Sequence, residues 1–242
     1  MTLETGSNRR PAGYKMQILI TAGGTREYID PVRFISNASS GKMGYALARA
    51  ALKAGHKVTL ITAPTTQRPP DAAKVVKVET TIQMFEAVKN YFDRCDCLIM
   101  AAAVADYTPL RPAKAKLKKN DQLLTVKLKP TPDILKWAGK QREVKGKKHA
   151  LSKAEGARGK RQIVVGFALE DKAVRVRAQE KLQGKKLDMI VANSPVAIGA
   201  DKSNIQIKTP DSSWIEIQNA TKTATAKKII RLAEELLRAK LK

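Results

Sequence analysis

The sequence predicts an α/β protein built on a mostly parallel sheet with helices on both faces. Short runs of β-branched and other apolar residues alternate with amphipathic segments from Met16 onward. These runs do not alternate strictly between apolar and polar residues, which is typical of strands buried on both faces of a parallel sheet. The 242 residues and 43% hydrophobic content can bury a sizeable core. We therefore expect a single domain at 16–242, after a disordered N-terminal extension at 1–15.

The first half of the chain carries four strand signals and two helix signals in alternation. The expected strands are MQILITA at 16–22, KVTLIT at 57–62, VVKVET at 75–80 and DCLIMAAAV at 96–104. The first helix is expected at 41–54, where Gly55 ends it. The second is expected to begin at a capping box formed by Thr80 and Gln83 and to end near Phe92.

After Asp106 the pattern changes to a lysine-rich segment, which we interpret as a basic flap at about 107–120. A strand-like LLTVKLK follows at 123–129, then a short helix that opens at Pro132 and Asp133. The segment 142–161 has no clear periodicity and is rich in Lys and Gly, so we expect an exposed insertion. The remaining expected elements are a strand at 162–169, a helix at 171–183, a strand at 188–193, a hairpin at about 203–218 and a terminal helix from Thr221. The repeated strand–helix order predicts a Rossmann-like sheet.

Several classes of protein fit the composition poorly. Cys95 and Cys97 are the only cysteines and are separated by one residue, which suits neither a disulfide framework nor a zinc site. With only His56 and His149, a histidine metal site or a Ser-His-Asp hydrolase is also not indicated. No apolar run is long enough to span a bilayer, and the N-terminus lacks the apolar middle of a signal peptide. We therefore expect a cytoplasmic protein that does not bind membranes.

The positive charge is concentrated in one part of the chain. The formal net charge is +24, and residues 108–162 hold 17 Lys and Arg against 4 Asp and Glu, a net of +13. Such a charge suits nucleic acid, a membrane surface or an anionic substrate. One interpretation is a solvated surface; another is a mobile basic element that closes over phosphates.

Small and polar residues follow the first expected strand. TAGGT at 21–25 and SSGKMG at 39–44 let the backbone approach a ligand and supply a helix N-terminus, which attracts anions. The loop between them contains the polar residues Arg26, Asp30, Arg33 and Asn37. In open α/β sheets this end of a strand is where ligands bind. Close packing of helix on strand would also explain the glycines, but the polar loop favours a binding site.

The familiar nucleotide-binding fingerprints are missing. The sequence contains neither Gly-x-Gly-x-x-Gly nor a Walker A motif, and the strand KVTLIT ends without an acidic residue for a ribose. No tyrosine is followed four residues later by lysine, the pair used by short-chain dehydrogenases. A nicotinamide-dependent oxidoreductase is therefore a weaker alternative.

Six segments, in this order and spacing, resemble the bacterial-type phosphopantothenoylcysteine synthetases. They are DPVRFISNASSGKMG, AAAVADY with the lysines KAKLKK after it, PDIL, VGFALE and LDMIVAN. The resemblance covers Met16 to about Lys240. The flavin-dependent decarboxylase half that often precedes this domain is not in the sequence, so the chain is similar to the stand-alone form.

The resemblance implies a ligase of coenzyme A biosynthesis that joins 4'-phosphopantothenate to L-cysteine. In this family CTP transfers a nucleotidyl group to the substrate carboxylate with release of pyrophosphate, and cysteine then displaces CMP. Both steps develop charge on oxygen atoms, so the site needs cations, fixed hydrogen-bond donors and Mg²⁺ rather than a protein nucleophile. CTP and Mg²⁺ are the implied co-substrate and metal; the metal ligands stay unassigned.

The resemblance assigns catalytic roles to three residues. Asn37 matches the asparagine that holds the acyl nucleotidylate and donates to its carbonyl; alternatively it caps the helix that begins near Ser40. Arg33 could bind the acyl phosphate bidentately, or form a surface ion pair. Lys116 matches the flap lysine that neutralises charge at the α-phosphate, with Lys118 and Lys119 as alternatives.

Other positions match the family's nucleotide site. Lys181 and Lys185 lie one helical turn apart and so share a face, although a solvated helix surface would look the same. Phe167 fits an apolar wall for the base, and plain strand packing would also explain the alanines. The full nucleotide-binding set is Ser39, Ser40, Gly41, Ala101, Ala102, Ala103, Asp106, Pro132, Asp133, Ile134, Leu135, Phe167, Lys181 and Lys185.

The resemblance also implies a homodimer, with the late hairpin as a candidate contact region. CTP is favoured over ATP because SSGKMG and KLKK resemble the bacterial branch. The main alternative from another class is a basic nucleic-acid-binding module. Aromatic residues make up only 5% of the chain and no RNA-binding motif interleaves them with the lysines, so specific nucleic-acid binding is not expected.

Overall fold

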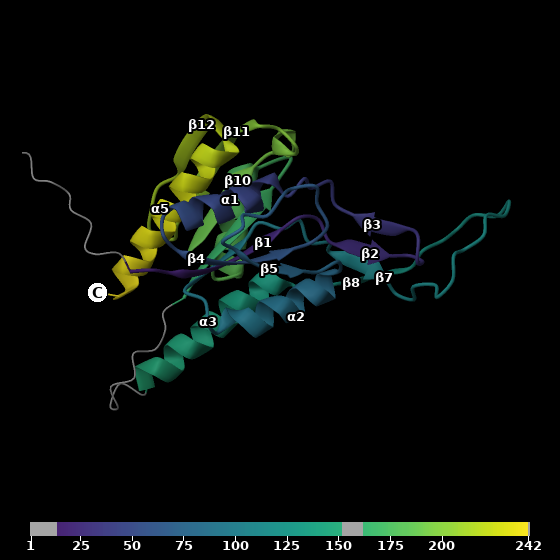
Figure 1. The fold of residues 1–242 in the computed structure, drawn as a ribbon, viewed down its shortest axis with the longest axis horizontal. Helices are drawn as coiled ribbons and strands as arrows, with labels where there is room; N and C mark the ends of the chain where they lie inside the picture. The colour runs from purple at the N-terminus through teal and green to yellow at the C-terminus, as the bar shows by residue number, and fades with distance from the viewer. Residues whose placement is uncertain (1–13, 152–161, 242) are drawn as a thin grey trace, which may run out of the picture.

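The computed structural model describes residues 14–151 and 162–241, and its centre is an eight-stranded sheet (Figure 1). The strand order is β12-β11-β10-β9-β6-β1-β4-β5. The strands are β1 Gln17–Ala22, β4 Lys57–Thr62, β5 Lys74–Lys77, β6 Cys97–Met100, β9 Ile163–Leu169, β10 Met189–Asn193, β11 Lys202–Lys208 and β12 Ile215–Thr221. Six neighbouring strands are parallel: β5, β4, β1, β6, β9 and β10. Strands β11 and β12 continue the sheet as an antiparallel hairpin. The expected mostly parallel α/β sheet and the late hairpin are confirmed.

The strand order reverses at the pair β1 and β6. From β1 the chain moves outward through β4 to β5, and it then returns to β6 on the other side of β1 and continues to β9 and β10. The carboxyl ends of β1 and β6 therefore form the reversal point of the sheet, the place where open α/β sheets bind ligands.

Two helix layers cover the sheet, one on each face (Figure 1). Helices α1 (Lys42–Lys53) and α5 (Lys222–Leu241) pack on one face, where Tyr45, Leu47 and Ile229 are buried. Helices α2 (Thr81–Phe92), α3 (Ile134–Leu151) and α4 (Val174–Gly184) cover the other face. A 3₁₀ turn at Pro195–Ala197 follows β10. No helix in the part of the chain that the structure describes has the length and apolar character needed to cross a membrane.

Two small antiparallel pairs lie beyond the carboxyl edge of the sheet. One joins β2 (Arg26–Tyr28) to β3 (Phe34–Ser36), and the other joins β7 (Tyr107–Pro109) to β8 (Leu128–Pro130). The segment that connects β7 to β8 projects away from the sheet in Figure 1. The expected basic flap is thus an extended excursion between two short paired strands, longer than the 107–120 predicted for it.

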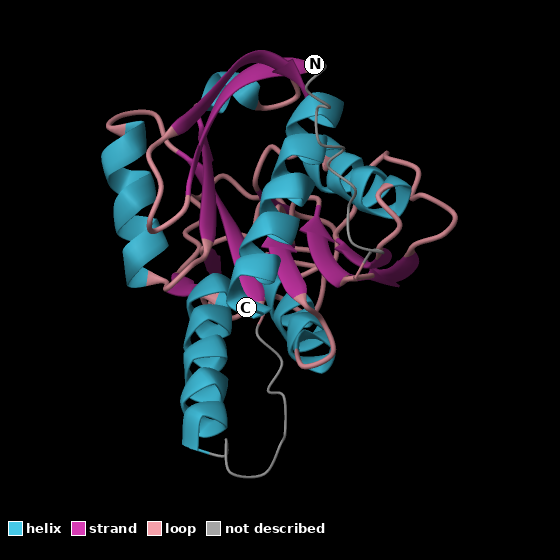
Figure 2. Cartoon of the chain, turned by 90° about the vertical axis from the view of Figure 1, so that its left-hand side faces the viewer, coloured by secondary structure: helices cyan, strands magenta, loops and turns pink. Residues whose placement is uncertain are grey.

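Three expected elements differ from the structure. Most of 123–129 is not a strand: Leu123 is 99% exposed, and pairing starts only at Leu128. The short helix after Asp133 continues to Leu151, so the first half of the expected insertion 142–161 is helical, and this end of α3 projects from the body (Figure 2). Residues 152–161, the second part of the expected insertion, lie outside the described residues. So do residues 1–13 of the extension expected at 1–15. The third strand ends at Lys77 because Thr80 caps α2 through the expected capping box.

Candidate active site

The loops after β1 and β6 are joined backbone to backbone at the reversal point of the sheet. The Ala103 N–H donates to the Gly23 carbonyl at 2.8 Å, and the Thr25 N–H donates to the Ala103 carbonyl at 3.2 Å. Gly24 lies so close to the next loop that a Cβ there would stand 2.9 Å from the Asn37 carbonyl oxygen. The glycine is needed for this approach, which brings Asn37 beside the loop that leaves β6.

Three threonines hold the residue before Asp106. The Ala105 N–H donates to Thr25 Oγ1 at 2.9 Å, and its carbonyl accepts from Thr81 Oγ1 at 3.3 Å and Thr131 Oγ1 at 2.7 Å. Thr25 and Thr81 are fully buried. Satisfied buried hydrogen bonds of this kind give a loop one geometry. They fix the position from which the exposed Asp106 leaves the sheet.

The Asn37 side chain lies between the two loops rather than capping a helix. Its Nδ2 donates to the Val104 carbonyl at 3.1 Å. The helix-cap alternative is wrong, because the N-cap of α1 is Gly41, in the left-handed region at φ 72°, and makes no side-chain cap. An amide NH₂ has two donors. Asn37 can therefore stay anchored to Val104 while it donates to a substrate carbonyl.

The Ser39–Gly41 turn opens α1 and is supported by the loop after β4. Thr65 Oγ1 donates to the Ser40 carbonyl at 2.8 Å, and a Cβ on Gly41 would lie 2.9 Å from the same hydroxyl oxygen. The first N–H groups of α1 have no partner within the helix, and the helix dipole favours an anion there. The turn can thus receive a phosphate.

Lys42, the first residue of α1, faces the loop before β11. Its Nζ lies 2.8 Å from Asp201 Oδ1 and 3.2 Å from the Gly199 carbonyl. The hydrogen bond and charge of Lys42 hold the pKa of Asp201 below its usual range. This pair links the start of α1 to the hairpin half of the sheet.

Arg33 is engaged by its neighbour in the structure. Its Nε donates to Asp30 Oδ2 at 3.0 Å and its Nη2 donates to the Leu117 carbonyl at 2.8 Å. Arg33 therefore forms an ion pair, but its partner Asp30 is buried, so the pair is not the surface ion pair of the alternative. The edge of the guanidinium expected to bind a phosphate bidentately is directed at protein groups.

The flap lysines are exposed. Lys116, Lys118 and Lys119 all face solvent, and Leu117 is anchored to Asp30 and Arg33 between the first two. Exposure does not distinguish among the three lysines. The anchored Leu117, however, keeps Lys116 beside the loop that carries Arg33.

A second cluster of charged side chains lies between the start of α3 and the end of α4. Lys185 pairs with Asp133 at 2.9 Å, and Asp133 Oδ1 caps α3 by accepting from the Lys136 N–H at 2.9 Å. Burial lowers the pKa of Lys181, and Lys185 lowers it further, against the opposing carboxylates of Glu170, Asp133 and Asp106. Burial alone would raise the pKa of Asp133, but the Lys136 N–H and Lys185 outweigh it and the pKa is lowered.

The structure divides the predicted nucleotide-binding set between two sides of the sheet. Phe167 packs on the α1 and α5 side. Lys181 lies in α4 on the opposite side, where Lys185 follows the end of α4 and Asp133 precedes the start of α3. Ala101 packs against the first core and Ala102 against the second, so the end of β6 lies between both groups.

Two members of the predicted set are core residues. Ile134 and Leu135, the first two residues of α3, are buried at 2% and 7% exposure. Only their backbone could meet a ligand, and that backbone is the amino-terminal turn of α3. The side chains serve packing, which the sequence segment PDIL alone does not reveal.

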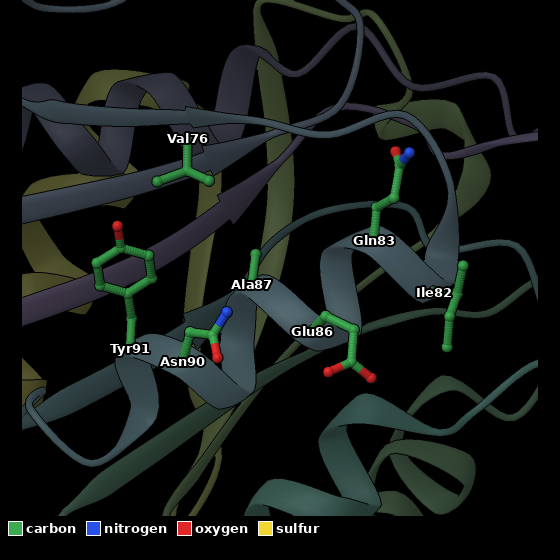
Figure 3. Close-up of a pocket in the computed structure, with 7 residues that line it drawn as sticks. All are labelled: Val76, Ile82, Gln83, Glu86, Ala87, Asn90 and Tyr91. Carbon is green, nitrogen blue, oxygen red and sulfur yellow. The ribbon is translucent and has the colours of Figure 1, made fainter.

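A separate cavity of about 420 Å³ lies on the α2 side (Figure 3). Its lining comes from β5 and α2 alone, with Val76 on the strand and the other labelled residues on the helix. It contains none of the predicted site residues. Among residues 14–151 and 162–241, no three His, Cys, Asp or Glu side chains gather into a metal-binding group.

Comparison with known proteins decides the family. The model of the DNA/pantothenate metabolism flavoprotein C-terminal domain matches residues 14–237. The chain belongs to this family. A solved structure of a relative is the C-terminal domain of Coenzyme A biosynthesis bifunctional protein CoaBC. Its sequence is 36% identical to this chain, and the two structures align with a TM-score of 0.73. The match covers 93% of this chain and 96% of that one.

Curated relatives of this flavoprotein C-terminal domain are longer proteins. The CoaBC protein of Bacillus subtilis is 44% identical over 184 residues, which are 76% of this chain and 41% of that protein. The Borreliella burgdorferi CoaBC protein is 36% identical over 89% of this chain and 52% of its own length. The chain thus spans about half the length of the curated relatives it matches. A structure of mutant Cab2 with phosphopantothenate-cysteine, 16% identical with a TM-score of 0.70, shares the fold.

Proposed function

We propose that the chain is a phosphopantothenate-cysteine ligase that joins 4'-phosphopantothenate to L-cysteine through an acyl-cytidylate. The observation that carries the proposal is the meeting of three family segments near the β1 and β6 ends. DPVRFISNASSGKMG contacts AAAVADY through Asn37 and Val104, and it contacts the flap lysine segment through Asp30 and Leu117. Its relatives support it, since they are named for coenzyme A biosynthesis, and the C-terminal half of CoaBC has been solved as a separate domain.

The first half-reaction joins a carboxylate to a nucleotide. A carboxylate oxygen of 4'-phosphopantothenate attacks the α-phosphorus of CTP, a new O–P bond forms, and pyrophosphate leaves with the electrons of the broken bond. The N-terminus of α1 and the Ser39–Gly41 turn would hold phosphate oxygens. Lys116 would meet the charge that develops at the α-phosphate.

The second half-reaction makes the amide. The cysteine nitrogen attacks the acyl carbon, CMP leaves, and the nitrogen loses a proton. The second N–H of Asn37 would stabilise the oxygen that becomes negative, while the first keeps the side chain on Val104. Arg33 would reach the acyl phosphate through Nη1, since Nε and Nη2 serve Asp30 and Leu117.

When bound, Mg²⁺ would supply neutralisation of the phosphate charge. The exposed Asp106 is the carboxylate at this edge that would hold the ion. Lys181 and Lys185 would compensate the remaining phosphate charge. Preference for CTP over ATP and a homodimer joined through the late hairpin are parts of the same proposal.

The proposal is tested by incubating the chain with 4'-phosphopantothenate, L-cysteine, CTP and Mg²⁺. We expect equal amounts of pyrophosphate, CMP and phosphopantothenoylcysteine, and slower turnover with ATP. Formation of none of these products with either nucleotide would refute the ligase assignment. Size-exclusion chromatography with light scattering tests the dimer separately.

A further inference from the structure

Asp30 is a buried carboxylate at the centre of the loop between β2 and β3. Its side chain has no exposed surface. Oδ1 accepts from the Val32 N–H at 2.9 Å and the Arg33 N–H at 2.8 Å, and Oδ2 accepts from Arg33 Nε at 3.0 Å. The family resemblance gives no role to this residue. Its neighbours nevertheless supply the hydrogen bonds and the positive charge that stabilise a carboxylate anion away from water.

The same carboxylate reaches the flap. Asp30 Oδ2 also accepts from the Leu117 N–H at 3.1 Å, and Arg33 Nη2, which bonds Asp30, donates to the Leu117 carbonyl at 2.8 Å. A third bond runs from the Ala113 N–H to the Ile29 carbonyl at 2.8 Å. Both backbone groups of Leu117 are thus held by one ion pair. Residues 114–116 and 118–125, on the two sides of Leu117, are exposed.

The charge of Asp30 is what holds the arrangement together. The Arg33 guanidinium, with the N–H groups of Val32, Arg33 and Leu117, keeps the pKa of Asp30 far below its usual range. The group is therefore an anion at any neutral or mildly acidic pH. A neutral amide in its place would keep the shape but offer one acceptor instead of two and would turn an NH₂ toward other donors.

We propose that Asp30 is a positioning residue that docks the flap and orients Arg33 together, and so sets where Lys116 stands for nucleotidyl transfer. Docking and orientation are one event because the same guanidinium bonds both Asp30 and the Leu117 carbonyl. The catalytic part of this inference rests on the proposed ligase function. The docking part does not, and it can be measured without substrates.

Limited trypsin digestion measures docking directly. In Asp30→Asn we expect cleavage after Lys118 and Lys119 to be about tenfold faster than in the wild type, since a released loop is a preferred site of nicking. Cleavage after the exposed Lys172, in another loop, is the internal reference. Asp121→Asn is the matched control: it removes the same charge from the flap itself, at an exposed residue away from the anchor, and should digest like the wild type. Equal cleavage of Asp30→Asn and wild type would overturn the proposal.

Single-turnover kinetics measure the consequence for chemistry. We expect Asp30→Asn to slow pyrophosphate release about 10- to 100-fold at saturating CTP, because small misplacements of a catalytic group are costly. Reaction of preformed acyl-cytidylate with cysteine should slow less. Equal slowing of both half-reactions would indicate general damage and contradict the positioning role. If the wild type itself releases no pyrophosphate, the ligase proposal fails and the digestion result still decides docking.

A second variant protects the test from misfolding of Asp30→Asn. Leu117→Pro removes the flap N–H that Asp30 accepts, together with the leucine side chain and the free φ angle at 117, and it leaves the pair of Asp30 and Arg33 in place. Because trypsin does not cut before proline, cleavage is followed after Lys118 and Lys119. We expect faster cleavage and slower pyrophosphate release with an unchanged melting temperature. Wild-type behaviour in both assays would overturn the proposal.

Discussion

Asn37 illustrates how a single side chain can be both anchored and available. Its Nδ2 holds the Val104 carbonyl at 3.1 Å, while the side chain is exposed at the sheet edge. In Asn37→Asp the carboxylate cannot donate to Val104 and would repel an oxyanion. We expect the second half-reaction to slow about 100-fold, so that acyl-cytidylate accumulates and is seen by mass spectrometry. Normal turnover without a trapped intermediate would remove Asn37 from this role.

The lowered pKa of Lys181 predicts how CTP binding depends on pH. Burial and Lys185 lower its pKa, so its charge is lost at a lower pH than that of an ordinary lysine. CTP should therefore bind more weakly as the pH rises toward and through that pKa, because the neutral amine no longer attracts phosphate. Lys181→Arg keeps its charge at these pH values and should bind CTP with a flatter pH profile. Titration calorimetry between pH 7 and 10 checks this, and identical profiles would contradict it.

Residue-level contacts divide into those that the sequence can indicate and those that it cannot. The segment around Asn37 is recognisable because its polar residues crowd one loop after a buried strand. The hydroxyls of Thr25, Thr81 and Thr131 converge on Ala105 from distant parts of the chain. No local pattern marks them. The burial of Asp30 beneath Arg33 is hidden for the same reason, because it depends on the flap.

At the scale of elements, α3 and the end of α4 approach closely at Gly139. A Cβ there would stand 1.9 Å from the Lys185 carbonyl oxygen, a backbone atom that cannot turn away. This approach lets Asp133, at the start of α3, meet Lys185. Gly139→Ala should cost about 3 kcal/mol of unfolding free energy by overpacking and weaken CTP binding.

The matched control is Gly184→Ala at the end of α4. Nothing lies within 4 Å of a Cβ at that position, so this variant should match or slightly exceed the wild type in stability. Urea unfolding followed by circular dichroism gives both values. Equal stability of the two variants would show that the approach at Gly139 is looser than the structure has it.

Elements were predictable where a periodic pattern coincides with burial. The capping box of Thr80 and Gln83 is local, so the start of α2 follows from the sequence. Residues 123–127 have a strand-like composition but find no partner strand, and propensity without pairing does not make a strand. The β2 and β3 pair was missed because three-residue strands leave no period to detect.

At the scale of the whole molecule, Asp188 ties together elements from both faces of the sheet. It pairs with Lys240 of α5 and Arg142 of α3 and accepts from the Val164 N–H at 2.8 Å. Its side chain is only 8% exposed. Asp188→Asn removes the anion that both cations face, and we expect a loss of about 3 kcal/mol in unfolding free energy.

Asp201→Asn is the control for Asp188→Asn, because it also removes a carboxylate that pairs with a lysine, but at an exposed position. The Asp201 side chain is 88% exposed in its pair with Lys42, so this variant should unfold like the wild type. Thermal denaturation of the two variants side by side distinguishes a buried tie from a surface pair. A similar small effect of both substitutions would contradict the role given to Asp188.

The net charge of +24 is a property of the whole chain and needs no nucleic-acid function. Exposed lysines, many of them in residues 108–162, should bind any polyanion weakly, and the binding should weaken steeply with salt. We expect fluorescently labelled RNA to dissociate between 50 and about 200 mM salt. Tight binding that survives this change would revive the nucleic-acid alternative.

Pyrophosphate release in the absence of cysteine tests the central claim most directly. With 4'-phosphopantothenate, CTP and Mg²⁺ but no cysteine, the ligase account predicts a burst of about one pyrophosphate per chain, as the acyl-cytidylate forms and stays bound. Added cysteine should then release CMP and start turnover. Release of pyrophosphate that does not depend on 4'-phosphopantothenate, or no release with CTP or ATP, would contradict the account.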